Sequence, residues 1–181
     1  MPRIKPAVLD NLDTSTAGVL AAVTEKMGSL PNIFTTFAHS PVTLNGYLQL
    51  SDTLSKGKLT AAQRELIAVA VAQENQCGYC LSAHAAIGKS VGLTEDDIAQ
   101  AQQGKAVRPK DQAIINFAIQ VMHAQGAVSD EALATILGVL NDEGCVLEIV
   151  SNVILNTMTN YLNRLAGTQI DFPIMELDVC A

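Results

Sequence analysis

The stretch that begins at Thr60 combines a helix start signal with an unbroken apolar run, and it constrains the fold more than any other part of the chain. Thr60 can cap a helix, and Gln63 can return the hydrogen bond as in a capping box. Residues 66–72 are all apolar. Such a run also fits a buried strand, but the cap and the helix-forming residues Arg64 and Glu65 favour a buried helix.

Helix start and stop signals recur along the rest of the chain, whereas the alternating patterns typical of strands are scarce. We therefore predict an all-α fold, formed by residues 1–181 as a single compact domain of about seven to nine helices. The tail, residues 168–181, is expected to be non-helical and to pack on its own subunit or on a neighbour. The further helices are predicted from Pro41 to Gly57, through Leu81 to residues 88–91, from Thr94 to Gly104, from Pro109 to Gly126, from Ser129 onward, and over residues 144–166.

The last of these helices carries no charge between residues 149 and 163, although it is interrupted by regularly spaced asparagines. A broad apolar stripe runs beside them. Two interpretations remain open: a core helix with a neutral outer edge, or a helix covered by a second subunit. The asparagines are Asn152, Asn156, Asn160 and Asn163, and the apolar residues are Val146, Ile149, Val150, Val153, Ile154, Met158, Tyr161, Leu162 and Leu165.

The composition excludes several functional classes. A chain of 181 residues with a net charge of −7 and only 11 Lys and Arg residues lacks the positive face that nucleic-acid binding requires. No apolar run approaches the roughly 20 residues of a membrane span. The apolar residues 17–23 follow Asp10 and Asp13 and do not resemble a signal peptide. We expect a cytoplasmic protein that binds neither nucleic acid nor membranes.

Four cysteines are too few for a disulfide scaffold, but Cys77 and Cys80 form a close pair. In a reducing compartment such a pair indicates redox or metal chemistry. A third interpretation is that the two cysteines are only packing residues. A structural zinc site takes four ligands, and Cys77, Cys80 and His84 supply only three. Cys145 and Cys180 stand alone and are expected to be incidental.

The Cys-x-x-Cys pair is predicted to lie at a helix N-terminus, where free amide groups and the helix dipole stabilise a thiolate. Cysteines three residues apart share a helix face and can form a disulfide. His84 lies one turn beyond Cys80, so its imidazole can act as a base on that thiol. Glu65 has small or apolar helical neighbours, which predicts a partly buried carboxylate able to relay protons. The remaining histidines, His39 and His123, are expected to be structural.

These residues carry a family resemblance. Glu65, followed at a distance by Cys77-Gly78-Tyr79-Cys80 and His84, resembles the motif of the alkylhydroperoxidase D-like proteins, in the peroxidase-related branch of the carboxymuconolactone decarboxylase superfamily. The likeness covers most of the chain. It continues in Leu59-Thr60, Ala83-His84, Gly92-Leu93-Thr94, Leu30-Pro31-Asn32, His39-Ser40-Pro41 and Asp171-Phe172-Pro173.

The resemblance implies an all-helical, oligomeric thiol peroxidase without haem, flavin or metal. It assigns Cys80 as the peroxidatic thiol, Cys77 as the more exposed resolving thiol, His84 as the base and Glu65 as the proton relay. Tyr79 stands where peroxidase members have a histidine; it is a candidate hydrogen-bond relay but a poor base at neutral pH. The decarboxylase proper lacks the cysteine pair, which argues against a lactone substrate.

Three functions follow from the sequence. The first is a peroxidase that reduces alkyl hydroperoxides, needs no bound cofactor and takes electrons from an external thiol or dithiol. In it, His84 is coupled to Glu65 through Tyr79 or water. The second is a dithiol–disulfide oxidoreductase, and the third is a non-catalytic redox-sensing oligomer. In each case we expect a homo-oligomer: a dimer, a trimer or a hexamer.

Overall fold

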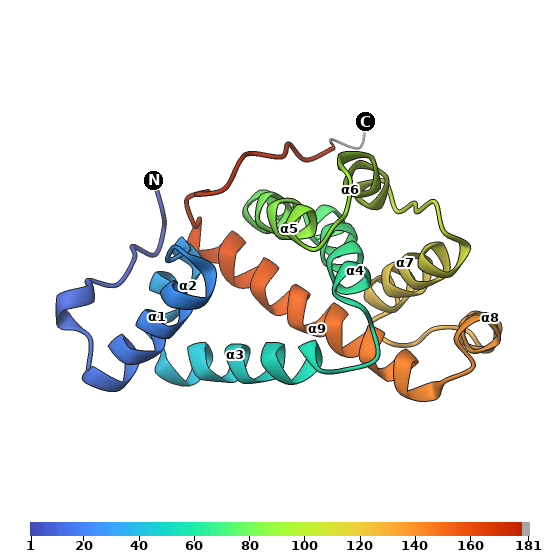
Figure 1. The fold of residues 1–181 in the computed structure, drawn as a ribbon, viewed down its shortest axis with the longest axis horizontal. Helices are drawn as coiled ribbons and strands as arrows, with labels where there is room; N and C mark the ends of the chain where they lie inside the picture. The colour runs from blue at the N-terminus through green and yellow to red at the C-terminus, as the bar shows by residue number, and fades with distance from the viewer. Residues whose placement is uncertain (179–181) are drawn as a thin grey trace.

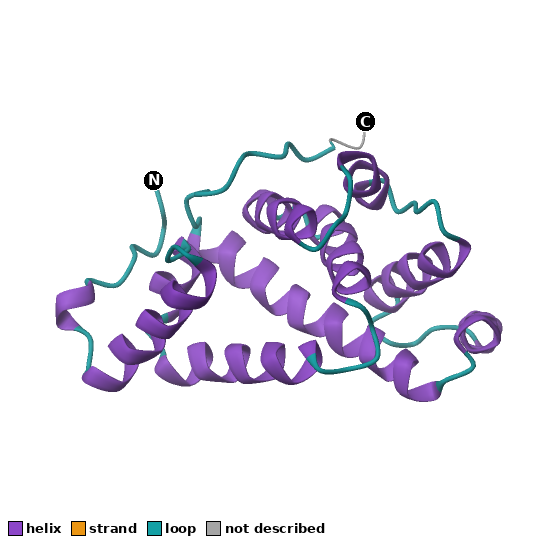
Figure 2. Cartoon of the chain, viewed as in Figure 1, coloured by secondary structure: helices purple, strands orange, loops and turns teal. Residues whose placement is uncertain are grey.

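Helices make up the regular structure of the computed structural model, which describes residues 1–178 (Figures 1 and 2). Over this range there are nine α helices, one short 3-10 helix and no strand, as the sequence predicted. None of the described helices has both the length and the apolar composition needed to cross a bilayer. The elements are η1 (Leu9–Asn11), α1 (Thr14–Met27), α2 (Asn32–Phe37), α3 (Pro41–Ser55), α4 (Ala61–Glu74), α5 (Gly78–Ser90), α6 (Glu95–Gln102), α7 (Pro109–His123), α8 (Asp130–Leu140) and α9 (Glu143–Ala166).

The helices α3, α4 and α7 begin where the capping and proline signals of the sequence predicted a helix start. At α4 both hydrogen bonds of the capping box are present: the Gln63 backbone N–H donates to Thr60 Oγ1 at 3.2 Å, and the Thr60 N–H donates to Gln63 Oε1 at 3.1 Å. Pro41 and Pro109 occupy the first turns of α3 and α7. Local capping chemistry therefore fixes where these helices start.

The centre of the fold is α4, which packs against α5, α6, α7 and α9 (Figure 1). Its side chains contribute to two hydrophobic clusters on different sides. Leu66, Val69 and Ala70 belong to the first, with α1, α2 and α5, while Ile67 and Val71 belong to the second, with α7, α8 and α9. A helix that is apolar all round has to be buried all round. The prediction of a buried helix here is confirmed.

The two faces of α9 are arranged opposite to one of our expectations. Its four asparagines are buried, and Asn160 has no exposed surface at all. Several of its apolar residues are exposed instead, with 58% of Ile154 accessible. The prediction of a neutral outer edge is therefore wrong, because the amides form hydrogen bonds inside the molecule. The exposed apolar residues are Leu147, Ile154, Tyr161 and Leu165.

The segment after α9 forms a strap, residues 168–178, that runs across α5 toward α6 (Figure 1). The Met175 N–H donates to Ser82 Oγ at 3.1 Å. The Gln102 side-chain amide donates to the Glu176 carbonyl at 2.8 Å. The strap is non-helical as predicted, and of the two locations considered for the tail, these residues occupy the one on their own subunit.

Candidate active site

A tight turn between α4 and α5 places the cysteine pair. The backbone N–H of Cys77 donates to the Ala72 carbonyl at 2.9 Å, which closes the last turn of α4. Gln76 adopts the left-handed conformation with φ of 54°, a conformation that costs energy for a residue with a side chain. The chain thereby reverses quickly, and Cys77 becomes the N-cap of α5.

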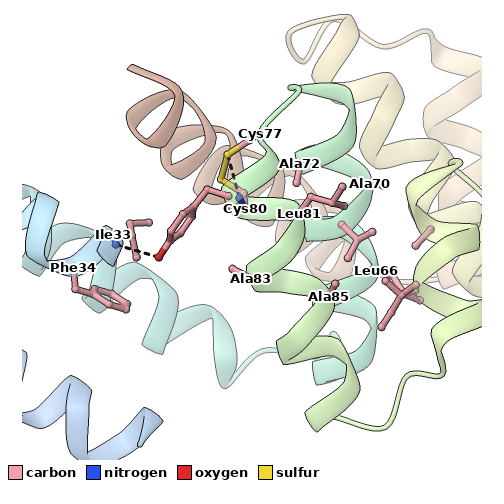
Figure 3. Close-up of a cluster of buried hydrophobic side chains, with 14 of the residues drawn as sticks. Ile33, Phe34, Leu66, Ala70, Ala72, Cys77, Cys80, Leu81, Ala83 and Ala85 are labelled. Atoms are coloured by element: carbon pink, nitrogen blue, oxygen red, sulfur yellow. Dashed lines mark hydrogen bonds between the residues drawn. A yellow bond between two sulfur atoms is a disulfide. The ribbon is translucent and has the colours of Figure 1, made fainter. Parts of the chain in front are cut away.

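Cys77 and Cys80 are joined as a disulfide, with their Cα atoms 5.3 Å apart (Figure 3). The Cys77 sulfur also accepts the backbone N–H of Cys80 at 3.3 Å, so it serves as the helix cap. The expectation that Cys77 is the more exposed of the two is wrong for this chain, since 1% of Cys77 and 2% of Cys80 are accessible. The strap lies close to this turn, since a Cβ atom on the neighbouring Gly78 would lie 3.8 Å from the Cδ1 atoms of Ile170 and Leu177.

Glu65 and His84 meet across α4 and α5. His84 Nδ1 lies 2.8 Å from Glu65 Oε2, and 18% of the His84 side chain and 16% of the Glu65 side chain are exposed. The predicted partial burial of Glu65 is confirmed. The predicted coupling through Tyr79 or water is wrong, because the two side chains contact each other directly. A carboxylate at Nδ1 orients the imidazole and leaves Nε2 as the nitrogen that can accept a proton.

Tyr79 points away from this pair, although it lies between the two cysteines in sequence. Its hydroxyl accepts the backbone N–H of Ile33 at 3.1 Å, and its ring packs edge-to-face on Phe172 with centroids 5.8 Å apart. Burial raises the pKa of the Tyr79 hydroxyl, so it stays protonated at neutral pH. Tyr79 therefore holds α2 and the strap against α5. These contacts do not favour a role as a hydrogen-bond relay between Glu65 and His84.

One residue at the disulfide was not identified from the sequence as part of the site. The side-chain amide of Asn163, on α9, donates to the Cys80 sulfur at 3.4 Å. The regular spacing of the asparagines was visible in the sequence, but it did not indicate that one of them reaches a cysteine. Contacts between α5 and α9 bring the two together.

Tyr47 on α3 is a second neighbour of the site that the sequence did not indicate. Burial, with a contribution from the nearby Glu65 carboxylate, raises the pKa of Tyr47 to about 12. Its ring packs against Phe34 and Phe37. Tyr47 therefore forms part of the partly apolar environment of Glu65.

The remaining candidate residues lie apart from the disulfide. His39 Nε2 is 2.9 Å from the Lys5 carbonyl, and His123 Nε2 is 2.8 Å from Glu74 Oε2. Cys145 is half-buried near the start of α9, and burial, with nearby Asp142, raises its pKa. Cys180 lies outside the described residues. Over residues 1–178, no group of three or more His, Cys, Asp or Glu side chains is arranged to hold a metal ion.

Two small hollows of the surface lie away from the residues of the candidate site. One of about 210 Å³ lies along α1, where Leu9, Leu20 and Leu30 are among its lining residues. Another of about 70 Å³ lies between the N-terminal segment and the start of the strap. Neither is lined by a residue of the disulfide or of the Glu65–His84 pair.

The segment that contains the candidate site matches a known protein family. Residues 41–124 match the model of the carboxymuconolactone decarboxylase family. No curated protein matches the chain in sequence.

Among solved structures, an uncharacterised peroxidase-related protein with an alkylhydroperoxidase D core, from Ralstonia eutropha JMP134, is similar with a TM-score of 0.86 and 24% identity over 94% of this chain and 92% of that one. A peroxidase-related protein from Silicibacter sp. TM1040 is similar with a TM-score of 0.82 and 20% identity over 93% of each chain. A cysteine-to-alanine variant of the debrominase Bmp8, in complex with 2,3,4-tribromopyrrole, has a TM-score of 0.78 and 16% identity over 93% of this chain and 91% of that one.

These matches confirm the resemblance seen in the sequence, and they extend the shared fold beyond the matched segment to almost the whole chain. Residues 41–124 contain the turn, both cysteines and the Glu65–His84 pair. Residues 41–124 therefore match the carboxymuconolactone decarboxylase family, and almost the whole chain shares the fold of the two peroxidase-related proteins.

Proposed function

We propose that this protein is a thiol-dependent peroxidase that reduces alkyl hydroperoxides through Cys77 and Cys80. The observation that carries the proposal is the combination on α4 and α5 of a disulfide-forming pair with a directly bonded, partly buried Glu65–His84 pair. A thiol peroxidase needs these two elements: a dithiol to carry two electrons, and a base that removes and returns a proton.

The reaction starts from the reduced pair. His84 accepts the proton of the Cys80 thiol, while the Glu65 carboxylate stabilises the resulting imidazolium. The Cys80 thiolate attacks the terminal oxygen of the hydroperoxide, and the O–O bond breaks. The alkoxide takes a proton from the imidazolium and leaves as an alcohol, and Cys80 becomes a sulfenic acid.

Cys77 completes the cycle. Its thiolate attacks the sulfur of the Cys80 sulfenic acid, and the departing hydroxide takes up the proton that the Cys77 thiol released, so water leaves as the disulfide forms. An external thiol or dithiol then reduces the disulfide to two thiols. The chain's own residues carry out each step, so the proposal needs no bound cofactor or metal. Because the disulfide must be reduced again after every turnover, we place the protein in a reducing compartment, the cytoplasm.

The burial of both sulfurs favours a small oxidant over a protein disulfide as the substrate. Thiol–disulfide exchange requires an attacking sulfur to approach a disulfide sulfur directly, and here only 1% and 2% of the two cysteines are accessible. A hydroperoxide needs a much smaller opening. The reductant that renews the pair must reach the same buried sulfurs, so we expect it to be a small thiol or dithiol as well.

The test is consumption of t-butyl hydroperoxide by the purified protein with a dithiol reductant. We expect turnover by the wild type, loss of turnover in Cys80→Ser, and wild-type turnover in Cys145→Ser, a matched cysteine outside the site. Equal rates for wild type and Cys80→Ser would overturn the proposal. Insulin disulfide and 2,3,4-tribromopyrrole, offered in parallel, identify disulfide exchange or reductive debromination if either is the faster reaction.

We also propose that the protein is a homo-oligomer that buries the outer face of α9. Leu147, Ile154 and Tyr161 recur every seven residues on that face, and Leu165 extends the same apolar stripe. Residues 149–163 contain no charge, so nothing on this stretch opposes contact with an apolar surface. A seven-residue apolar repeat is the pattern by which one helix packs along another. A second copy of α9 is the occupant that we propose.

A further inference from the structure

Asn163 differs from the first two asparagines of α9, Asn152 and Asn156. The side-chain amides of Asn152 and Asn156 donate to backbone carbonyls four residues earlier in the same helix, each at 2.8 Å. Asn163 instead donates to a sulfur on another helix, that of Cys80, at 3.4 Å. The contact joins residues 83 positions apart, so it is tertiary and does not contribute to forming α9 itself.

The same side chain leaves a buried polar atom without a partner. Over the described residues, Asn163 Oδ1 and Asn160 Nδ2 are buried and have no hydrogen-bond partner. Folded proteins rarely keep such atoms, because a buried donor or acceptor without a partner is unfavourable. Oδ1 and Nδ2 belong to one planar amide, so the unpartnered acceptor lies close to the Cys80 sulfur that Nδ2 contacts. An O–H group at that sulfur would satisfy it.

We propose that Asn163 is a catalytic residue of the dithiol site, where its amide N–H stabilises the Cys80 thiolate and its amide oxygen accepts the O–H of the incoming hydroperoxide. The inference rests on the proposed peroxidase function and deepens it, because it assigns the groups that bind the reacting atoms.

Cys80 needs such a donor because its own helix end is already used. The backbone N–H of Cys80 donates to the Cys77 sulfur, so the cap of α5 serves Cys77 and not Cys80. A hydrogen bond to the charged form of a group favours that form. Asn163 supplies one to Cys80 from α9, without adding a charge that would change with pH.

The Asn163 amide then takes part in the attack of the Cys80 thiolate on the hydroperoxide. The Cys80 thiolate forms a bond to the hydroperoxide oxygen that carries the hydrogen, and that hydrogen stays on the oxygen while it is bonded to Asn163 Oδ1. The O–O bond breaks, and the alkoxide leaves with the electron pair and takes the proton held by His84. The product is the Cys80 sulfenic acid, whose O–H is still bonded to the amide oxygen.

The test replaces the amide by an apolar group of similar shape, in Asn163→Leu, with Asn156→Leu as the matched control on the same buried face. In a background where Cys77, Cys145 and Cys180 are serine, the ultraviolet absorbance of the thiolate gives the titration midpoint of Cys80. The other titratable or charged groups near the pair, Glu65 on α4, His84 on α5 and Arg164 on α9, are the same in both variants.

We expect Asn163→Leu to raise the midpoint by about one pH unit, and, in the chain with all its cysteines, to slow the reaction with t-butyl hydroperoxide about tenfold at neutral pH. It should melt no lower than the wild type, because it removes an unpartnered buried acceptor. Asn156→Leu should keep the wild-type midpoint and rate. A residue with a purely structural role would give the opposite result: a lower melting temperature with an unchanged midpoint.

An unchanged midpoint and rate in folded Asn163→Leu, with an active wild type, would overturn this inference and leave the proposed function intact. If the wild type consumes no peroxide, the proposed function fails and so does the role of Oδ1. The titration would still decide whether Asn163 stabilises the thiolate. Asn163→Ala provides the same comparison if the leucine variant does not fold.

Discussion

His84 Nδ1 and Glu65 Oε2 lie 2.8 Å apart, so the imidazole of α5 is fixed directly by a carboxylate of α4. The two side chains are mostly buried, and the contact crosses the central helix pair of the fold. A carboxylate bonded to Nδ1 stabilises an imidazolium that forms when Nε2 accepts a proton. The orientation of this base therefore depends on the relative positions of the two helices.

Replacing Glu65 by glutamine should lower kcat/KM for t-butyl hydroperoxide by about 100-fold or more, because the amide keeps the shape but does not stabilise the imidazolium. Steady-state kinetics over a range of pH measure this. The matched control is Glu74→Gln. Glu74 lies on the same helix and contacts His123, and not His84, at the same distance, 2.8 Å. If Glu65→Gln is as active as Glu74→Gln, the Glu65–His84 pair has no part in the reaction.

Loosening the strap should make the disulfide easier to reduce. The ring of Phe172 holds the strap against Tyr79, and an aromatic contact of this kind contributes about 1 kcal/mol. We expect Phe172→Ala to be reduced by a small dithiol about fivefold faster, as followed by the mass of the alkylated protein. Ile174→Ala, which changes an exposed apolar residue of the same strap, should have the wild-type rate. Equal rates for both variants would show that the strap does not control access.

Stability should fall at high pH because of the two tyrosines beside the site. Burial raises the pKa of Tyr79, and burial with the Glu65 carboxylate raises that of Tyr47 to about 12. The folded chain therefore keeps these protons where the unfolded chain has lost them. The free energy of unfolding decreases as pH rises from about 10 through about 12, by up to about 1.4 kcal/mol per pH unit for each tyrosine.

Urea unfolding at a series of pH values measures this slope. Tyr47→Phe and Tyr79→Phe should each flatten it above about pH 10, even though Tyr79→Phe also loses the hydrogen bond from Ile33 and starts from a lower stability. Below pH 9 the two variants and the wild type should have parallel curves. Identical slopes in all three proteins above pH 10 would contradict the prediction.

A charge on the outer face of α9 should dissociate the oligomer. We expect light scattering to give the mass of more than one chain for the wild type and of a single chain for Ile154→Lys, because a lysine there would be buried without a partner. Val42→Lys, at an exposed apolar residue of α3, should associate like the wild type. A wild type that is monomeric at micromolar concentration excludes the proposed interface.

The parts of the fold that local chemistry determines could be predicted from the sequence. The capping box of Thr60 and Gln63 fixed the start of α4, and the apolar run that follows identified a buried helix. The spacing of Cys77 and Cys80 was enough to predict a pair that could be joined. Each of these inferences depends on residues a few positions apart, whose geometry is set by the helix itself.

What the sequence could not determine depends on distant partners. Helical periodicity divides α9 into an amide face and an apolar face, but it does not say which is buried. Which face is buried depends on Cys80 in α5 and Asn75 in the turn after α4, which contact Asn163 and Asn160. The direct Glu65–His84 contact likewise depends on the left-handed Gln76 in the turn, and glutamine gives no signal for that conformation.

The N-cap of α5 links the redox state of the cysteine pair to the stability of this helix. Cys77 is at once half of the disulfide and the group that accepts the Cys80 N–H at the helix start. A thiolate is a much stronger hydrogen-bond acceptor than a disulfide sulfur, because the bond to it is charge-assisted. Reduction should therefore tighten the first turn of α5, and oxidation should let it fray. By thermodynamic linkage, an interaction that stabilises this turn also favours the reduced protein. The packing around the first turn of α5 therefore contributes to the reduction potential of the Cys77–Cys80 pair.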